Sequence, residues 1–156
     1  MTAGMTNLDT EAQAAPARQA RQLSGLRRAS LGALVMLIVQ FGLGIGVNLY
    51  VTLPAKGSGG DAFSNGPLLA LHAVVGLLLV VAAIALLVRA IIARHGPVIA
   101  AGAVGLLAIV TAATQGFSFV SDGTNAASLA MALATGVAML CYAVALYLVR
   151  PPAQRA

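Results

Sequence analysis

The chain has 156 residues, of which 60% are hydrophobic and only 8% are charged. Soluble domains contain about 25% charged residues, so this chain lacks the polar side chains that a soluble surface needs. Its formal net charge of +5 comes from basic residues that flank apolar segments and form no patch with aromatics. This pattern indicates membrane topology signals and argues against a nucleic-acid partner. The single cysteine, Cys141, excludes a disulfide framework and a cysteine-based metal site within one chain.

The N-terminal region, 1–29, is rich in Ala, Gln, Thr and Arg and shows little apolar periodicity. We predict that it is a mobile, basic, cytoplasmic tail. The apolar run that follows, 30–53, is longer than the hydrophobic region of a signal peptide. Leu53 also stands at an unfavourable position for cleavage after Ala55. We therefore interpret this run as a retained membrane span.

Three further apolar segments follow, separated by short polar stretches. Gly66 or Asn65 is suited to cap the second segment, with Pro67 at its first helical position. We expect Gly96 to take the left-handed conformation at the end of that segment and Pro97 to begin the next one. Residues 121–125 have the composition of a turn with capping side chains. The sequence thus predicts one domain, 30–149, with spans at 30–53, 67–92, 97–119 and 126–149, followed by a cytoplasmic tail at 150–156.

Each segment has about 20 or more mostly apolar residues, enough to cross a hydrocarbon core of about 30 Å. Short connections favour neighbours of opposite direction. The predicted fold is therefore an all-α, integral membrane four-helix bundle with up-down-up-down order. Eight arginines fall on the side of the two termini, whereas the other side has only Lys56. The positive-inside rule then places both termini in the cytoplasm, and we expect the protein in the plasma membrane.

Four side chains are expected at one depth within the predicted bundle: Asn48, His72, Gln115 and Met131. The helical rise places each of them roughly 10 Å to the outer side of its helix midpoint. One interpretation is structural, since polar side chains in membrane helices hydrogen-bond across helices at about 0.6 kcal/mol per contact. The other is that the layer surrounds a cofactor, a quinone head group or a proton path, because ionisable residues in membrane helices mark functional sites.

The pattern His72-x-x-x-Gly76, followed by an apolar run and Arg89, resembles the second helix of prokaryotic cytochromes b561. The two-helix halves of the chain also resemble the bundles of haem A synthase. The resemblance implies that b-type haem lies between histidines on facing helices. The other three spans contain no histidine, so a bis-histidine site within one chain is impossible. His72 would then ligate the iron together with Met131, with a second chain, or as the only axial ligand.

We favour the hypothesis of a structural or accessory subunit of a membrane complex, whose partners are the lipid bilayer and a second copy or another membrane protein. The first alternative is a haem b-binding electron-transfer or oxidoreductase component that uses His72. The second is a carrier for a small solute, although no span has an internal proline or an acidic residue to couple ions. No nucleophile–base pair or phosphate-binding loop supports a soluble type of enzyme chemistry, and we assign no role to His95.

Overall fold

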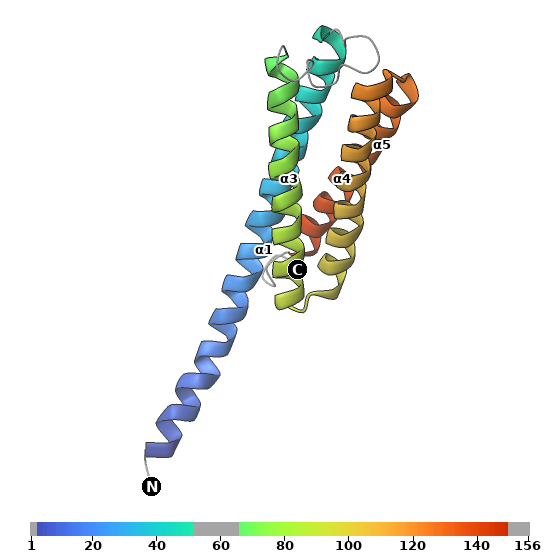
Figure 1. Cartoon of the computed structure of the whole chain (residues 1–156). Coiled ribbons are helices and arrows are strands. Elements are labelled where there is room, and N and C mark those ends of the chain that lie inside the picture. The colour runs from blue at the N-terminus through green and yellow to red at the C-terminus, as the bar shows by residue number, and fades with distance from the viewer. Residues whose placement is uncertain (1–2, 52–65, 150–156) are drawn as a thin grey trace.

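The computed structural model describes the backbone of residues 3–51 and 66–149, and their side chains from Arg18 onward except that of Asp122. Within these residues the protein is all-α, with no strand. Each of the four helices contains a stretch long and apolar enough to cross a membrane. They are α1 (Ala3–Tyr50), α3 (Pro67–Ile92), α4 (Gly96–Asp122) and α5 (Asn125–Leu148), shown in Figure 1.

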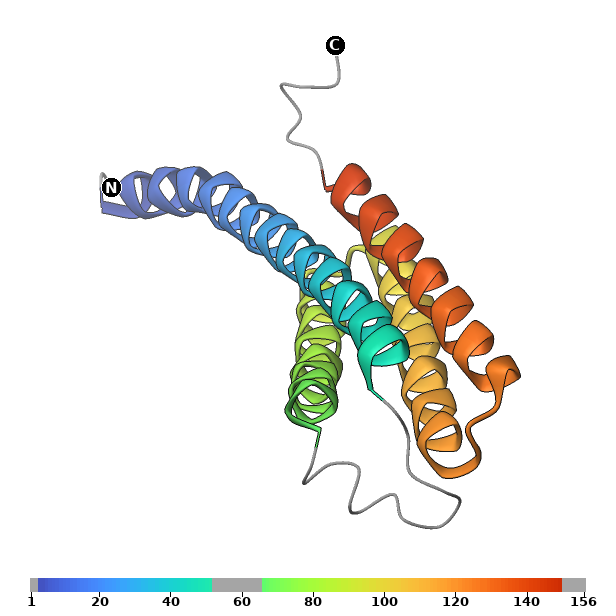
Figure 2. The same cartoon turned by 90° about the horizontal axis from the view of Figure 1, so that it is seen from above.

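The helices form a closed ring of four neighbours. Helix α1 packs against α3 and α5, and α4 packs against the same two helices. The α3–α4 connection and the α4–α5 connection lie at opposite ends of the bundle (Figure 1). We call these the Arg94 end and the Thr124 end. Helix α1 finishes and α3 begins at the Thr124 end, while the N-terminal part of α1 runs beyond the Arg94 end (Figures 1 and 2).

Two helix boundaries match the sequence prediction closely. Helix α3 spans the predicted 67–92, with Gly66 as its N-cap and Pro67 in the first turn. At the Thr124 end, Gly123 closes α4 with a left-handed φ of 64°. The hydroxyl of Thr124 then accepts a hydrogen bond of 3.4 Å from the Ala127 N–H and so caps α5. Small and capping residues therefore make the predicted turn at 121–125.

The α3–α4 turn corrects one expectation. The left-handed residue is Arg94, with a φ of 51°, whereas Gly96 is the first residue of α4. The Arg94 N–H donates to the Ile91 carbonyl at 3.0 Å and the His95 N–H donates to the Ala90 carbonyl at 3.2 Å. These two bonds form a Schellman motif, which requires the left-handed residue directly after the helix cap. Arg94, and not Gly96, therefore has the strained left-handed conformation.

The first helix begins well before the predicted span. The span predicted from residue 30 lies within α1, which is continuous from Ala3. Leu26 is only 2% exposed and Leu23 is partly buried. The physical reason is that Ala, Gln, Arg and Leu favour helix, while leucines three residues apart lie on one helix face. The tail predicted at 150–156 lies outside the described residues.

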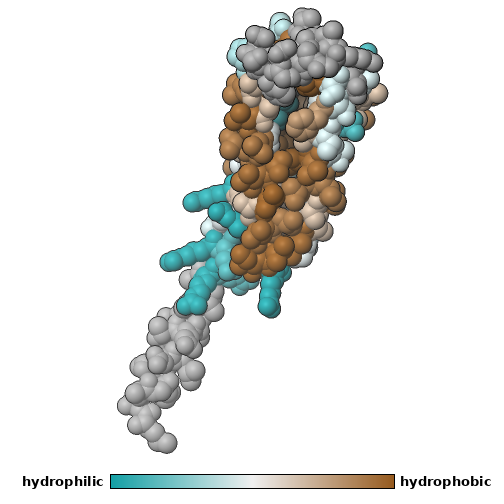
Figure 3. Space-filling view, in the orientation of Figure 1, coloured by the Kyte–Doolittle hydropathy of each residue, from teal (hydrophilic) through white to brown (hydrophobic). Residues whose placement is uncertain are grey.

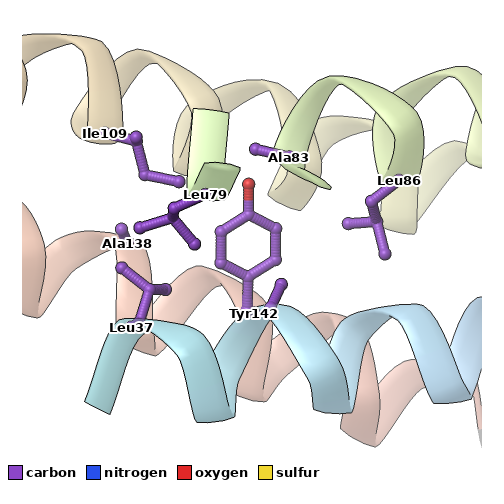
Figure 4. Close-up of a cluster of buried hydrophobic side chains, with 8 residues drawn as sticks. Leu37, Leu79, Ala83, Leu86, Ile109, Ala138 and Tyr142 are labelled. Carbon is purple, nitrogen blue, oxygen red and sulfur yellow. The ribbon is translucent and has the colours of Figure 1, made fainter. Parts of the chain in front are cut away.

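The core is concentrated in the middle of the bundle and at the Arg94 end. Tyr142 of α5 is fully buried, and its ring lies among aliphatic side chains of all four helices (Figure 4). A second cluster at the Arg94 end contains Leu26, Ala90, Val98, Ala145 and Val149. At the Thr124 end the corresponding cluster has only two buried members, Val47 and Leu69. Large aliphatic side chains cover the outside of the bundle (Figure 3).

Candidate ligand-binding pocket

A pocket of about 350 Å³ lies between the four helices in the half of the bundle toward the Thr124 end. Its floor is formed by Leu37, Leu79 and Ile109, which also belong to the central core cluster. Toward the Thr124 end it is lined by Val47 and Leu69. Most of the lining is apolar, so the few polar side chains in it decide what kind of molecule could be held there.

Gln40 of α1 and His72 of α3 form a polar contact on one wall of this pocket. The amide Nε2 of Gln40 lies 3.2 Å from Nε2 of His72 and 3.0 Å from the His72 backbone oxygen. With one N–H directed at each of these atoms, Nε2 of His72 acts as the acceptor. The imidazole is then neutral and carries its proton on Nδ1.

Two glycines provide the space for this contact. A Cβ atom on Gly44 would lie 3.2 Å from Cε1 of His72, and a Cβ atom on Gly76 would lie 2.9 Å from Nε2 of Gln40. The His72 ring thus packs on Gly44, four residues after Gln40, and the Gln40 amide packs on Gly76, four residues after His72. In each helix the polar residue and the glycine lie on the same face. The pair Gln40–Gly44 and the pair His72–Gly76 interlock α1 and α3 in one register.

Several polar atoms in or beside the pocket have no hydrogen-bond partner within the described residues. Nδ1 of His72 and Oε1 of Gln40 are buried without one. The Asn48 amide is exposed in the pocket wall near the end of α1, and Ser128 lies in the first turn of α5. In contrast, the Thr135 hydroxyl donates to a carbonyl of its own helix at 2.8 Å. The pocket therefore offers hydrogen-bonding groups toward the Thr124 end and along one wall.

The structure brings together three of the four residues that the sequence placed at one depth. Asn48, His72 and Met131 line the same pocket, but Gln115 does not. The Met131 sulphur packs over Gly116 of α4, where a Cβ atom would lie 3.5 Å away. His72 hydrogen-bonds to Gln40, and no hydrogen bond joins it to Asn48 or Gln115 within the described residues.

Position along the helix axis did not identify Gln40 as the partner of His72. Gln40 lies about two turns farther from the end of α1 than Asn48. A different signal in the sequence could have found it. Both helices repeat a polar residue followed four positions later by glycine, and this spacing suits a reciprocal contact between neighbouring helices.

The contact with Gln40 also bears on whether His72 could hold haem. Iron is bound by an unprotonated imidazole nitrogen, and in the tautomer above this is Nε2, which already accepts from Gln40. Ligation would require the Gln40 amide to turn away. Within the described residues no group of three or more His, Cys, Asp or Glu side chains could hold a metal ion.

Comparison with protein-family models, characterised proteins and solved structures finds no match to this chain. The geometry of the pocket is therefore the basis for a functional assignment.

Proposed function

We propose that this chain is a multi-pass membrane protein that holds a small amphiphilic molecule in the pocket between its helices, in an accessory role within a membrane system. The observation that carries this proposal is the pocket itself, to which all four helices contribute. An apolar floor at Leu37 and Leu79 suits a hydrocarbon chain or ring. The Asn48 amide and the Ser128 hydroxyl toward the Thr124 end suit a polar end group.

Insertion in the bilayer, with up-down-up-down order and cytoplasmic termini, is part of the proposal. Four helices of spanning length and an aliphatic exterior support insertion, because a surface of this kind would associate in water. The arginines of the described residues, from Arg18 to Arg94, lie toward one end of the bundle. That asymmetry supports the cytoplasmic placement of this end, and the plasma membrane remains the expected location.

Cysteine labelling tests the topology. In a Cys141→Ala background, cysteines at Ser58 and Thr124 should react with an impermeant thiol reagent in intact cells. A cysteine at Ala14 should react only after the membrane is opened. Labelling at Ala14 alone would reverse the orientation.

Ligand binding can be tested by filling the pocket. Ala132 of α5 lines the pocket, whereas Ala143 of the same helix is exposed and outside it. We expect Ala132→Leu to reduce binding of an environment-sensitive fluorescent fatty acid by the detergent-purified protein. Ala143→Leu, which adds the same side chain, should leave binding unchanged. Equal binding by the wild type and both variants would contradict a ligand site in this pocket.

Haem b is a second candidate for the same pocket, because His72 and Met131 both line it. The absorption spectrum of protein produced with ample haem tests it. A Soret band that is lost in His72→Ala and shifted in Met131→Leu would support axial ligation by these residues. Colourless wild-type protein would remove the haem hypothesis and leave the accessory role. A solute carrier, the remaining alternative, stays a prediction.

A further inference from the structure

The described part of the chain has exposed positive charge without any neutralising carboxylate. Its six arginines are all exposed, and their guanidinium groups make no hydrogen bond within the described residues. The four acidic residues of the chain, Asp9, Glu11, Asp61 and Asp122, all lie outside the described side chains. The six arginines are Arg18, Arg21, Arg27, Arg28, Arg89 and Arg94.

Four of these arginines lie level with the Arg94 end of the bundle. Leu26 packs in the same buried cluster as Ala90 and Val98, which places Arg27 and Arg28 beside the α3–α4 turn. Arg89 is in the last turn of α3, and Arg94 is in the turn itself. Figure 3 shows hydrophilic side chains that project outward from this end, directly next to the apolar surface of the bundle.

We propose that this group of arginines, Arg27, Arg28, Arg89 and Arg94, binds the head groups of anionic phospholipids. The proposal rests on the membrane insertion proposed above, since it requires the apolar surface to be surrounded by lipid. A guanidinium group donates two parallel N–H bonds to phosphate oxygens and suits this ligand better than a point charge does. The position of the arginines at the border of the apolar surface favours lipid phosphate over nucleic acid or an acidic protein, which would approach from the aqueous phase.

The helical geometry predicts a graded contribution. Arg21 and Arg18 are seven and ten residues before Arg28 in α1, so they lie about 10–15 Å farther along the helix axis. That distance equals or exceeds a Debye length of about 8–10 Å. Each arginine near the membrane surface should increase the affinity for an anionic lipid by about fivefold. Arg18 and Arg21 should contribute less.

The experiment compares two lipids that share acyl chains and differ in head-group charge. We expect native mass spectrometry of the full chain to show stronger retention of phosphatidylglycerol than of phosphatidylcholine. The triple variant Arg27→Gln/Arg28→Gln/Arg94→Gln should lose most of this preference. The matched Lys triple, which keeps the charges, should retain part of it, and Arg18→Gln/Arg21→Gln should lose little.

Equal retention of both lipids by the wild type would overturn the proposal, as would an unchanged preference in the Gln triple. If the Gln triple does not fold, the wild type still decides, because high salt should weaken the preference for the anionic lipid. The pocket is tested separately. A lipid acyl chain held in the pocket would bind through its hydrocarbon. Ala132→Leu should therefore lower retention of both lipids equally and leave the head-group preference intact.

Discussion

The two halves of the bundle use the same four helices but fill the space between them differently. In the half toward the Arg94 end, Tyr142 occupies the centre and is 0% exposed, with leucines of α1 and α3 around it (Figure 4). In the half toward the Thr124 end, the central space is a pocket bordered by Gly44, Gly76 and Gly116. The difference lies in the size of the side chains that point inward.

Glycine serves both halves in opposite ways. In the packed half, Gly105 of α4 receives the aromatic ring of Tyr142, so that α5 fills the centre. In the open half, Gly44 and Gly76 receive the imidazole and the amide of the α1–α3 interlock. These two polar side chains are thereby held on one wall of the pocket. The main core and the proposed ligand site thus lie toward different ends of the same helices.

The largest expected effect is in the packed half. Tyr142→Ala should lower the free energy of unfolding by about 3–5 kcal/mol, because it empties the centre of the core. Reversible unfolding in mixed micelles, followed by far-UV circular dichroism, measures it. The control is Tyr142→Phe, which removes a buried hydroxyl that has no partner among the described residues and should be neutral or stabilising by about 1 kcal/mol. A strongly destabilised Phe variant would show that the hydroxyl has a partner.

Gly105 tests how closely α4 and α5 are fitted. A Cβ atom there would lie 3.0 Å from the ring of Tyr142, so Gly105→Ala should destabilise the protein by about 1–3 kcal/mol. Gly136 of α5 has nothing within 4 Å of the corresponding position. Gly136→Ala should therefore stabilise its helix by about 0.5–1 kcal/mol. The same unfolding assay compares them, and equal effects would argue against the tight contact at Gly105.

The turn that closes the packed half carries a strained residue. Arg94 has a φ of 51°, which glycine adopts without a steric cost. Arg94→Gly should therefore raise the free energy of unfolding by about 1 kcal/mol. The thermal midpoint should rise with it. Arg94→Ala removes the same charge but keeps the Cβ atom, so it should give no such gain. Stabilisation by both variants would assign the effect to charge and not to backbone strain.

The smallest effect concerns the interlock in the open half. A double-mutant cycle of Gln40→Ala and His72→Ala should give a coupling energy of about 0.6 kcal/mol, the average for polar contacts between membrane helices. The matched cycle of Asn48→Ala and His72→Ala should give a smaller value, since no hydrogen bond joins these two side chains in the described structure. A larger coupling for Asn48 than for Gln40 would contradict the observed pairing.

The helices themselves could be predicted from the sequence because each signal is local. Apolar runs of spanning length, Pro67 in a first turn and Gly123 after a last turn act through the backbone of their own segment. The left-handed residue of the α3–α4 turn was not predictable in this way. Glycine is the residue that best suits a left-handed conformation, but the hydrogen bonds of the Schellman motif require that conformation at Arg94 and not at Gly96.

The sequence by itself determined that this is an all-α chain with four apolar helices and one histidine inside an apolar segment. It also placed His72, Asn48 and Met131 at a common depth, which is a consequence of helical rise alone. Only the tertiary structure decided which helix faces meet, and hence that Gln40 contacts His72, that Tyr142 fills the centre, and that a pocket remains toward the Thr124 end. The physical reason is that rotation of a helix about its axis is fixed by side-chain packing between helices, and a uniformly apolar helix carries little information about that rotation.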